Sequence, residues 1–161
     1  MNCRNCGAAM RAVVERNYIY CDYCCTFCFP GDLEDSLDRV KRFPGIDPAA
    51  CPVCALSLFQ GTVEGVEVRY CEKCRGIFLP AGAFSEIIMK RRSSYRGPEN
   101  VVPLNTDELK RRILCPSCKK QMDVHPYYGP GTVVIDFCHP CKMIWVDHGE
   151  IAAIERAPGK R

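Results

Sequence analysis

Pairs of cysteines separated by two residues constrain this chain more than any other feature of its sequence. Each pair has the form Cys-x-x-Cys, and the pairs form three couples with 14, 16 and 19 residues between their two members. Two such pairs at about this separation are the usual ligand pattern of a zinc site. The sequence therefore predicts three zinc ions, each bound by four thiolates. The predicted metal ligands are Cys3, Cys6, Cys21 and Cys24; Cys51, Cys54, Cys71 and Cys74; and Cys115, Cys118, Cys138 and Cys141.

The three couples belong to a repeated unit, because other side chains recur with them. An apolar residue stands four positions after the second cysteine of each unit, and an aromatic residue stands directly before the third. The spacer of each unit has strand-like residues on both sides of a turn and is typical of a β-hairpin. A hairpin brings its two ends together, so it would place both cysteine pairs around one metal ion. The recurring residues are Met10, Leu58 and Met122, and Tyr20, Tyr70 and Phe137.

The sequence shows no signal for export, which favours reduced thiols over disulfides. The first ten residues, MNCRNCGAAM, lack the apolar segment of a secretory signal. The chain also lacks the ~18 consecutive apolar residues that a membrane-spanning helix requires. We therefore expect a cytoplasmic protein with reduced cysteines and no membrane partner.

The stretch CDYCCTFC offers four cysteines to a site that has room for two of them. When the three units are aligned, Cys25 falls at the position of Arg75 and Lys142. Cys28 falls at the position of Phe78 and Trp145, where a packing role is expected. We predict that Cys25 and Cys28 are not ligands. Two alternatives remain open, a ligand exchange within this stretch and a redox-active Cys25/Cys28 pair.

The third unit, CHPCKMIWVDHGEI, resembles the transcription-factor-IIB-type zinc ribbon. Trp145, Asp147, Gly149 and Glu150 stand where that pattern places Trp, Asp, Gly and Glu, and Met143 replaces a glycine. The second unit keeps four of the family's positions and loses both acids, and the first unit is the most divergent. The resemblance implies three tandem divergent copies, zinc binding, a ribbon fold and, more weakly, a role in transcription. The positions kept in the second unit are Gly76, Phe78, Leu79 and Gly82.

The predicted fold class is small, metal-dominated and β-rich, with three tandem zinc ribbons that are each followed by a short α-helix. The first helix is expected over residues 32–42, where Leu33, Leu37 and Val40 have helical spacing. The other two are expected over 83–92 and 149–156. The predicted domains are a first ribbon with its helix at 1–43, a second at 49–92, a linker at 93–108 and a third ribbon with its helix at 109–157.

The charge of the chain depends on its metal. The formal net charge is +3 with neutral thiols. Twelve thiolates and three Zn²⁺ ions would change it to −3. Positive charge is nevertheless concentrated on both sides of the predicted linker, and two tyrosines stand beside the turn of the third hairpin. The candidate nucleic-acid or partner contacts are Lys90, Arg91, Arg92 and Arg96; Lys110, Arg111 and Arg112; and Tyr127 and Tyr128.

The sequence does not predict an enzyme or a small-molecule substrate. Four cysteines fill the coordination sphere of zinc and leave no position for a catalytic water. The chain also lacks a Gly-rich phosphate loop and a nucleophile motif. We expect a non-catalytic adaptor that binds another protein through its zinc ribbons. The main alternative is a nucleic-acid-binding, transcription-associated factor that uses the basic residues of 90–112, and thiol redox chemistry is a third possibility.

Overall fold

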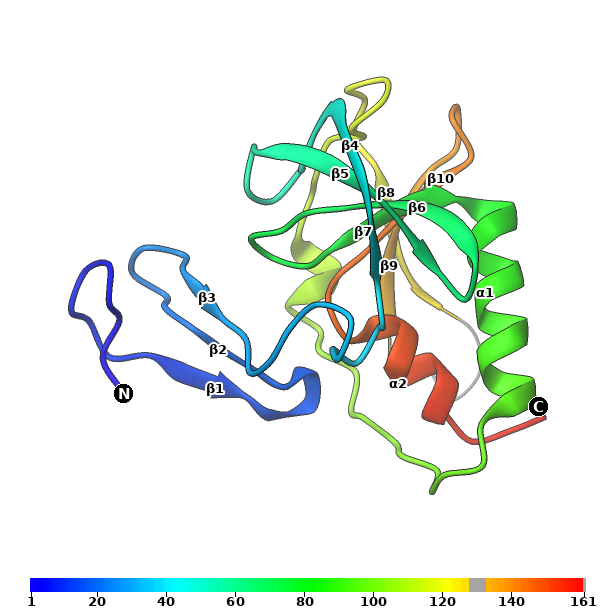
Figure 1. Cartoon of the computed structure of the whole chain (residues 1–161), viewed down its shortest axis with the longest axis horizontal. Helices are drawn as coiled ribbons and strands as arrows, with labels where there is room; N and C mark the ends of the chain where they lie inside the picture. Colours follow the sequence, from blue (N-terminus) through cyan, green and yellow to red (C-terminus); the bar gives the residue numbers. More distant parts are fainter. Residues whose placement is uncertain (128–132, 161) are drawn as a thin grey trace.

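The computed structural model describes residues 1–127 and 133–160. Within these residues the chain forms ten β-strands and two α-helices (Figure 1). The strands are β1 (Arg11–Val13), β2 (Tyr18–Tyr20), β3 (Phe27–Cys28), β4 (Lys41–Ala50), β5 (Ser57–Val63), β6 (Val66–Tyr70), β7 (Ile77–Pro80), β8 (Asp123–Tyr127), β9 (Val133–Cys138) and β10 (Met143–Val146). The helices are α1 (Ala81–Ser94) and α2 (Glu150–Arg156), and none in the described residues is long and apolar enough to cross a membrane.

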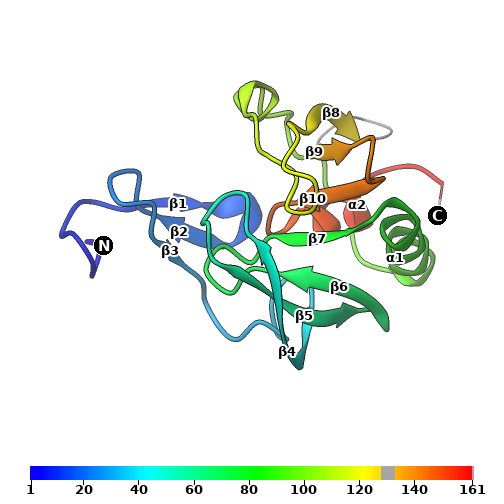
Figure 2. The same ribbon diagram turned by 90° about the horizontal axis from the view of Figure 1, so that it is seen from above.

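The strands form two antiparallel sheets of different size. The first ribbon has its own sheet in the order β1-β2-β3. The second and third ribbons share a seven-stranded sheet in the order β4-β5-β6-β7-β10-β9-β8. The two views show the small sheet projecting from one end of the molecule, while α1 lies at the other (Figures 1 and 2). The small β-rich fold predicted from the sequence is confirmed.

The second and third ribbons meet through corresponding strands, β7 and β10. Phe78 lies directly opposite Trp145, and these two residues occupy the same position in their repeats. Ile77 lies opposite Val146 on one side of this pair, and Leu79 lies opposite Ile144 on the other. Exchanging the two repeats turns one of these flanking pairs into the other. The junction therefore has local two-fold symmetry.

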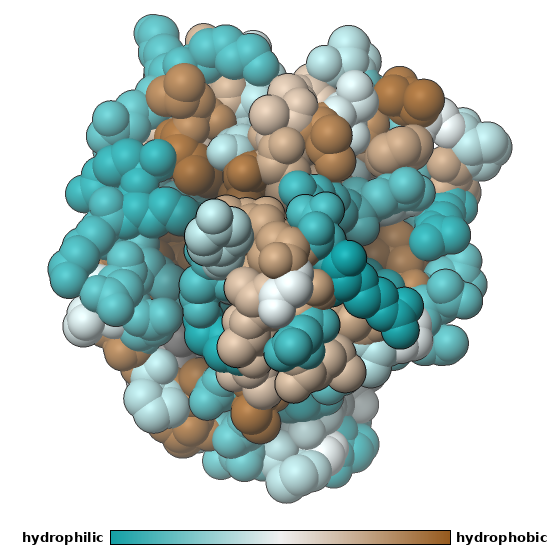
Figure 3. All heavy atoms as spheres, turned by 90° about the vertical axis from the view of Figure 1, so that its left-hand side faces the viewer, coloured by the Kyte–Doolittle hydropathy of each residue, from teal (hydrophilic) through white to brown (hydrophobic). Residues whose placement is uncertain are grey.

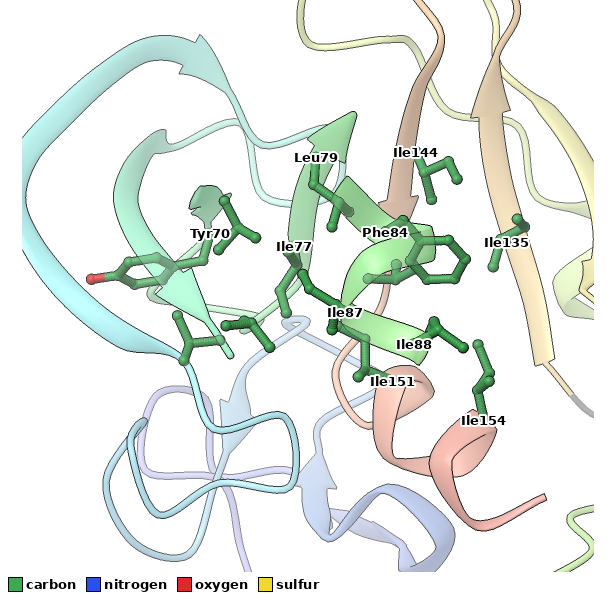
Figure 4. Packing of buried hydrophobic residues seen from close by; sticks show 14 of the residues in the cluster. Tyr70, Ile77, Leu79, Phe84, Ile87, Ile88, Ile135, Ile144, Ile151 and Ile154 are labelled. Carbon is green, nitrogen blue, oxygen red and sulfur yellow. The ribbon is translucent and has the colours of Figure 1, made fainter. Parts of the chain in front are cut away.

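The main core lies between the shared sheet and the two helices. Phe84, Ile87 and Ile88 of α1 are buried there against side chains of β7, β9 and β10. Ile151 and Ile154 of α2 close the same core (Figure 4). The second and third ribbons therefore contribute to one core, which neither could bury alone.

The helix predicted over residues 32–42 is wrong. Residues 32–40 form successive turns, and residues 41–50 belong to β4, an edge strand of the large sheet. Leu33 and Val40 are still buried in the main core, so their apolar spacing reflects packing without a helix. Pro44 and Pro48 fit this edge strand, because proline is tolerated at sheet edges and bulges. The pairing of β4 with β5 shifts register beside both prolines.

The helices predicted over 83–92 and 149–156 are confirmed by α1 and α2. A hairpin of β5 and β6 and a hairpin of β8 and β9 precede them, as expected. The last residue of the predicted linker begins the short 3₁₀ turn Glu108–Lys110. The side-chain oxygen of Asn105 accepts a hydrogen bond from the backbone N–H of Asp107 at 3.1 Å.

Candidate metal centres

The twelve cysteines predicted as ligands form three groups of four. Within each group the four sulfur atoms lie within 4.8 Å of one another. Individual contacts are 3.5 Å for Cys3–Cys24, 3.7 Å for Cys51–Cys74 and 3.5 Å for Cys118–Cys138. A tetrahedron of sulfurs at the usual Zn–S distance has edges of about 3.8 Å. Three such groups are compatible with three zinc ions.

Cysteine pairs in all three ribbons are held in tight turns by backbone hydrogen bonds. In the second ribbon the N–H of Cys71 donates to the carbonyl of Gly76 at 2.9 Å, and the N–H of Arg75 donates to the carbonyl of Cys71 at 2.8 Å. The residue after the second cysteine then adopts a positive φ, which is 58° at Arg75 and 56° at Cys25. The same conformation recurs at Gly7, Ala55, Lys119 and Lys142. Cys25 thus occupies a turn position that Arg75 and Lys142 occupy in the other repeats.

The surroundings of several thiols favour the thiolate form that zinc binds. The hydroxyl of Thr26, with Oγ1 3.1 Å from Sγ of Cys24, and the side chain of Asn5 lower the pKa of Cys24 to about 6. The backbone N–H of Lys120 lowers the pKa of Cys118 to about 7. Neighbouring cysteine side chains likewise lower the pKa of Cys71. In the same groups the pKa values of Cys6 and Cys141 are raised to about 12, and those of Cys54 and Cys74 are also raised, by neighbouring cysteine side chains and burial. Each group therefore contains one thiol that loses its proton more readily than the others.

The second and third centres share one apolar core. Cysteines from both groups pack with Leu58, Phe78, Met122 and Trp145, all four of which are fully buried. A Cβ atom at Gly76 would overlap the Trp145 ring, so glycine is needed there. The two centres therefore depend on the same side chains.

The first centre is more exposed than the others. Cys6 is exposed, and Cys24 is half-buried. Cys25 and Cys28 lie outside all three groups of the described chain, although both are free thiols. The packing role expected for Cys28 is not observed, because its side chain is exposed.

A network of charges that the sequence did not reveal connects the first ribbon to the third. The guanidinium of Arg16 lies 2.6 Å from Glu108, 3.1 Å from Glu150 and 3.7 Å from Asp147. Glu150 is almost fully buried, and burial raises its pKa well above the ordinary value, while Arg16 opposes that rise. In the sequence, only the match of Asp147 and Glu150 to the zinc-ribbon pattern pointed to any residue of this network. Its basic partner comes from a different repeat.

Asp38 makes a second connection that sequence reasoning missed. Its carboxylate accepts hydrogen bonds from the backbone N–H of Gly149 at 2.6 Å and of Ala152 at 3.2 Å, at the start of α2. His148 Nδ1 lies 3.7 Å from the same carboxylate, and burial lowers the pKa of His148. Asp38 thus caps a helix that is more than 100 residues away in the chain.

The predicted basic surface between 90 and 112 is largely used inside the molecule. Arg91 is 0 % exposed, lies 2.7 Å from Glu155, and donates to the carbonyls of Leu37 and Asp38. It therefore cannot contact a partner, and that part of the prediction is wrong. Arg111 lies 2.7 Å from Asp136 and 2.8 Å from Asp147, so it too serves a structural role.

The remaining basic residues also have partners within the chain. Arg92 donates to the carbonyls of Ile154, Ala157 and Lys160. The exposed residues of the set make short-range contacts, which leave their charges facing solvent: Lys90 with Glu86, Arg96 with Ser93, Lys110 with Asp107, and Arg112 with Leu109. Each of these four exposed cations therefore has a local partner of its own.

Two tyrosines were predicted as contact residues at the third hairpin, and Tyr127 is the last residue of β8. Tyr127 packs edge-on against Phe84 of α1, with ring centroids 5.0 Å apart, and it is half-buried beside the main core. This contact favours a packing role for Tyr127. Tyr128 lies outside the described residues.

Comparison with known proteins supports the interpretation of the second unit as a zinc ribbon. A family model described as a transcription factor zinc-finger, the TFIIB-type zinc ribbon, matches residues 50–90. The matched segment contains the whole second centre and the first part of α1. Neither the curated proteins nor the solved structures yield a match to the chain.

Proposed function

We propose that the protein is a non-catalytic zinc-binding protein whose three ribbons form a protein-interaction adaptor. The observation that carries the proposal is the composition of the centres. Each offers four cysteine sulfurs at tetrahedral spacing, and four thiolates leave zinc no open position for a substrate or a catalytic water. The metal ion then has a structural role. The resulting rigid surface is available to a partner.

Exposed apolar side chains support an interaction with protein. Phe43 and Ile46 on the edge strand β4 are 47 % and 66 % exposed. Val53 and Leu56, in the first cysteine turn of the second ribbon, are also exposed. Contiguous exposed apolar surface is typical of protein interaction sites. The internal pairing of Arg91 and Arg111 further weakens the case for a phosphate-binding track.

A nucleic-acid-binding function is the second candidate. It is favoured by the description of the family that matches residues 50–90 and by the exposed side chains of Lys90, Arg96, Lys110 and Arg112. Such a function would require these four cations to act together on phosphates.

Fluorescence anisotropy distinguishes the two candidates. Zinc-loaded protein is titrated against labelled single- and double-stranded DNA and RNA at two salt concentrations. The adaptor proposal expects no binding at either concentration. Binding that weakens steeply with salt would reveal phosphate contacts and would overturn the proposal.

A pair of variants makes the titration sharper. Lys110→Gln with Arg112→Gln removes two exposed cations, and Glu86→Gln with Asp107→Asn removes two exposed acids from the same region. If nucleic acid binds, the first variant should weaken it and the second should strengthen it. Equal, negligible binding by both variants and the unchanged protein is the outcome that the adaptor proposal expects.

A further inference from the structure

The second and third ribbons pair with each other through one strand of each, whereas the first ribbon has no such partner in the described chain. The paired strands, β7 and β10, directly follow the fourth cysteine of their repeats. They meet with Phe78 opposite Trp145 on a local two-fold axis. Edge strands with unpaired backbone groups commonly gain a partner in this way. The first ribbon carries the same kind of strand.

In the first ribbon this strand is β3, which is the last strand of its sheet. It pairs with β2 on one side, and the described chain provides no strand on the other. By alignment of the fourth cysteines, Phe27 corresponds to Ile77 and Cys28 corresponds to Phe78. The outer edge of β3 thus corresponds to the edge that β7 presents to β10.

One face of the small sheet is also uncovered where its counterparts are buried. Cys28 lies beside Ile19 and Ile19 beside Ala12, so these side chains share one face across three strands. The residues that correspond to Met10 and Cys28 in the other two repeats are fully buried between the second and third ribbons. In the first ribbon Met10 is half-buried and Cys28 is exposed. The buried counterparts are Leu58 and Met122, and Phe78 and Trp145.

The shape and chemistry of this surface fit an apolar partner. An apolar groove of about 420 Å³ runs along it and is lined by residues that include Met1, Val14, Ile19 and Cys28. Met1 and Val14 are among the most exposed large apolar side chains of the protein. Figure 3 views the end of the molecule on which this ribbon projects, and moderately hydrophobic residues, in pale brown, occupy much of the projecting part between hydrophilic ones. Exposed apolar surface of this kind marks an interaction site.

The sequence of the strand allows two identical copies to approach each other. Residues 26–30, Thr-Phe-Cys-Phe-Pro, carry no charge. If Cys28 stands on a two-fold axis, Phe27 of one copy faces Phe29 of the other, and no like charges meet. The existing pair obeys the same rule, because its facing residues are the uncharged Ile77 with Val146 and Leu79 with Ile144.

We propose that the first ribbon binds a second copy of this chain by pairing β3 with β3 of the partner around a two-fold axis. Cys28 then lies directly opposite Cys28 of the partner subunit, as Phe78 lies opposite Trp145. The inference rests on the proposed adaptor function and names its first partner. Because the paired segment is short, the dimer depends on protein concentration. Symmetric contacts of one patch with itself give a closed dimer and no longer assembly.

Light scattering coupled to size-exclusion chromatography tests the proposal over a range of concentrations. Zinc-loaded protein is expected to approach twice the monomer mass of 18.1 kDa as its concentration rises. Cys28→Asp places two carboxylates on the axis and should leave the protein at the monomer mass, since charges on an edge prevent strand pairing. Met89→Asp, at an exposed site on α1, is the matched control and should dimerise like the unchanged protein.

Cross-linking tests the register independently. Opposite residues of antiparallel strands have Cα atoms roughly 4.5–5.5 Å apart, a separation that a disulfide can span. Diamide should therefore join two chains through Cys28, with two thiols giving two electrons and two protons to the diamide. Cys25→Ser should retain the cross-link and Cys28→Ser should lose it. Peptide mapping identifies the joined residues.

The outcomes separate this inference from the function on which it rests. A monomer at every concentration, a dimer that survives Cys28→Asp, or a cross-link that does not involve Cys28 would each overturn the inference. Unchanged zinc content and circular dichroism in the variants show that folding is not the cause. A monomer that also binds no nucleic acid would defeat only the inference, whereas salt-sensitive nucleic-acid binding would defeat the proposed function.

Discussion

At the scale of single residues, the contact between Gly76 and Trp145 shows how closely the second and third centres are joined. The indole ring occupies the space that a side chain at position 76 would need, and its Nε1 donates to Asp147 at 3.0 Å. A ring held on both sides cannot move away at low cost, because protein cores are close-packed.

Gly76→Ala is therefore expected to destabilise the zinc-loaded protein by roughly 1–3 kcal/mol, the usual cost of overpacking a core. Denaturant unfolding monitored by circular dichroism measures the change. Gly82→Ala is the matched control, since a Cβ atom there meets no other atom within 4 Å. Gly82 lies in α1, so alanine should leave stability unchanged or raise it. Equal effects of the two substitutions would contradict the packing argument.

The neighbouring cysteines of the first ribbon allow a second residue-scale prediction. The double variant Cys25→Ser, Cys28→Ser should retain three zinc ions per chain, because neither thiol belongs to a cysteine group. Cys24→Ser should lose one zinc, because Cys24 lies within its group. Metal analysis of the purified proteins measures both. A double variant with only two zinc ions would show that the ligands of the first centre are assigned wrongly.

The grouping of the twelve cysteines could be predicted because local spacing determines which of them can reach one metal. The Arg16 and Asp38 networks could not. Arg16 meets Glu150, and Asp38 meets Gly149, only after distant repeats have packed together. A single sequence gives no indication of which charges will be neighbours in that arrangement. For the same reason the basic residues Arg91 and Arg111 were expected at the surface.

At the scale of secondary-structure elements, residues 32–42 show the limit of apolar periodicity. Helical spacing of Leu33 and Val40 predicts one buried face, and both are indeed buried. The backbone nevertheless forms turns, in which Ser36 N–H donates to the Leu33 carbonyl and Arg39 has a φ of 53°. By contrast, α1 was predicted correctly because Phe84, Ile87 and Ile88 form one face of a helix that packs on the sheet. Tertiary contacts decide the conformation of so short a segment.

The turns of 32–40 matter for the stability of α2 because they position Asp38. Replacing Asp38 with Ala leaves two backbone N–H groups of α2 without their acceptor. Loss of a helix cap usually costs about 0.5–2 kcal/mol, and we expect a loss near the upper end because the site is buried. Asp35→Ala is the control at an exposed aspartate in the same segment. Chemical denaturation should distinguish the two variants, and equal stability would rule out the cap.

At the scale of the whole molecule, the three centres are unequal. The second and third share a core around Trp145, and the first lies in a separate sheet with exposed Cys6. Metal binding and folding are coupled in small zinc domains. Loss of zinc from the first centre should therefore leave the shared sheet folded. Loss from either of the others should affect both.

A chelator should consequently remove zinc in two stages. The first stage releases one ion with little change in fluorescence, because the single tryptophan, Trp145, is fully buried in the core that the second and third centres share. The second stage releases two ions together and changes the fluorescence as the indole is exposed. A stopped-flow experiment that records zinc release and emission together tests this order. Release of all three ions in one step, or an early fluorescence change, would contradict it.

The pairing of β7 with β10 has a consequence for a cleaved chain. These strands belong to segments on either side of residues 95–107, yet the sheet joins them by backbone pairing and α1 packs beside α2. Several residues of this connection, including Glu99, Val101 and Asn105, are exposed to a protease. A single cut there would divide the covalent chain without dividing the fold. The two fragments should stay bound under native conditions and separate when zinc is withdrawn.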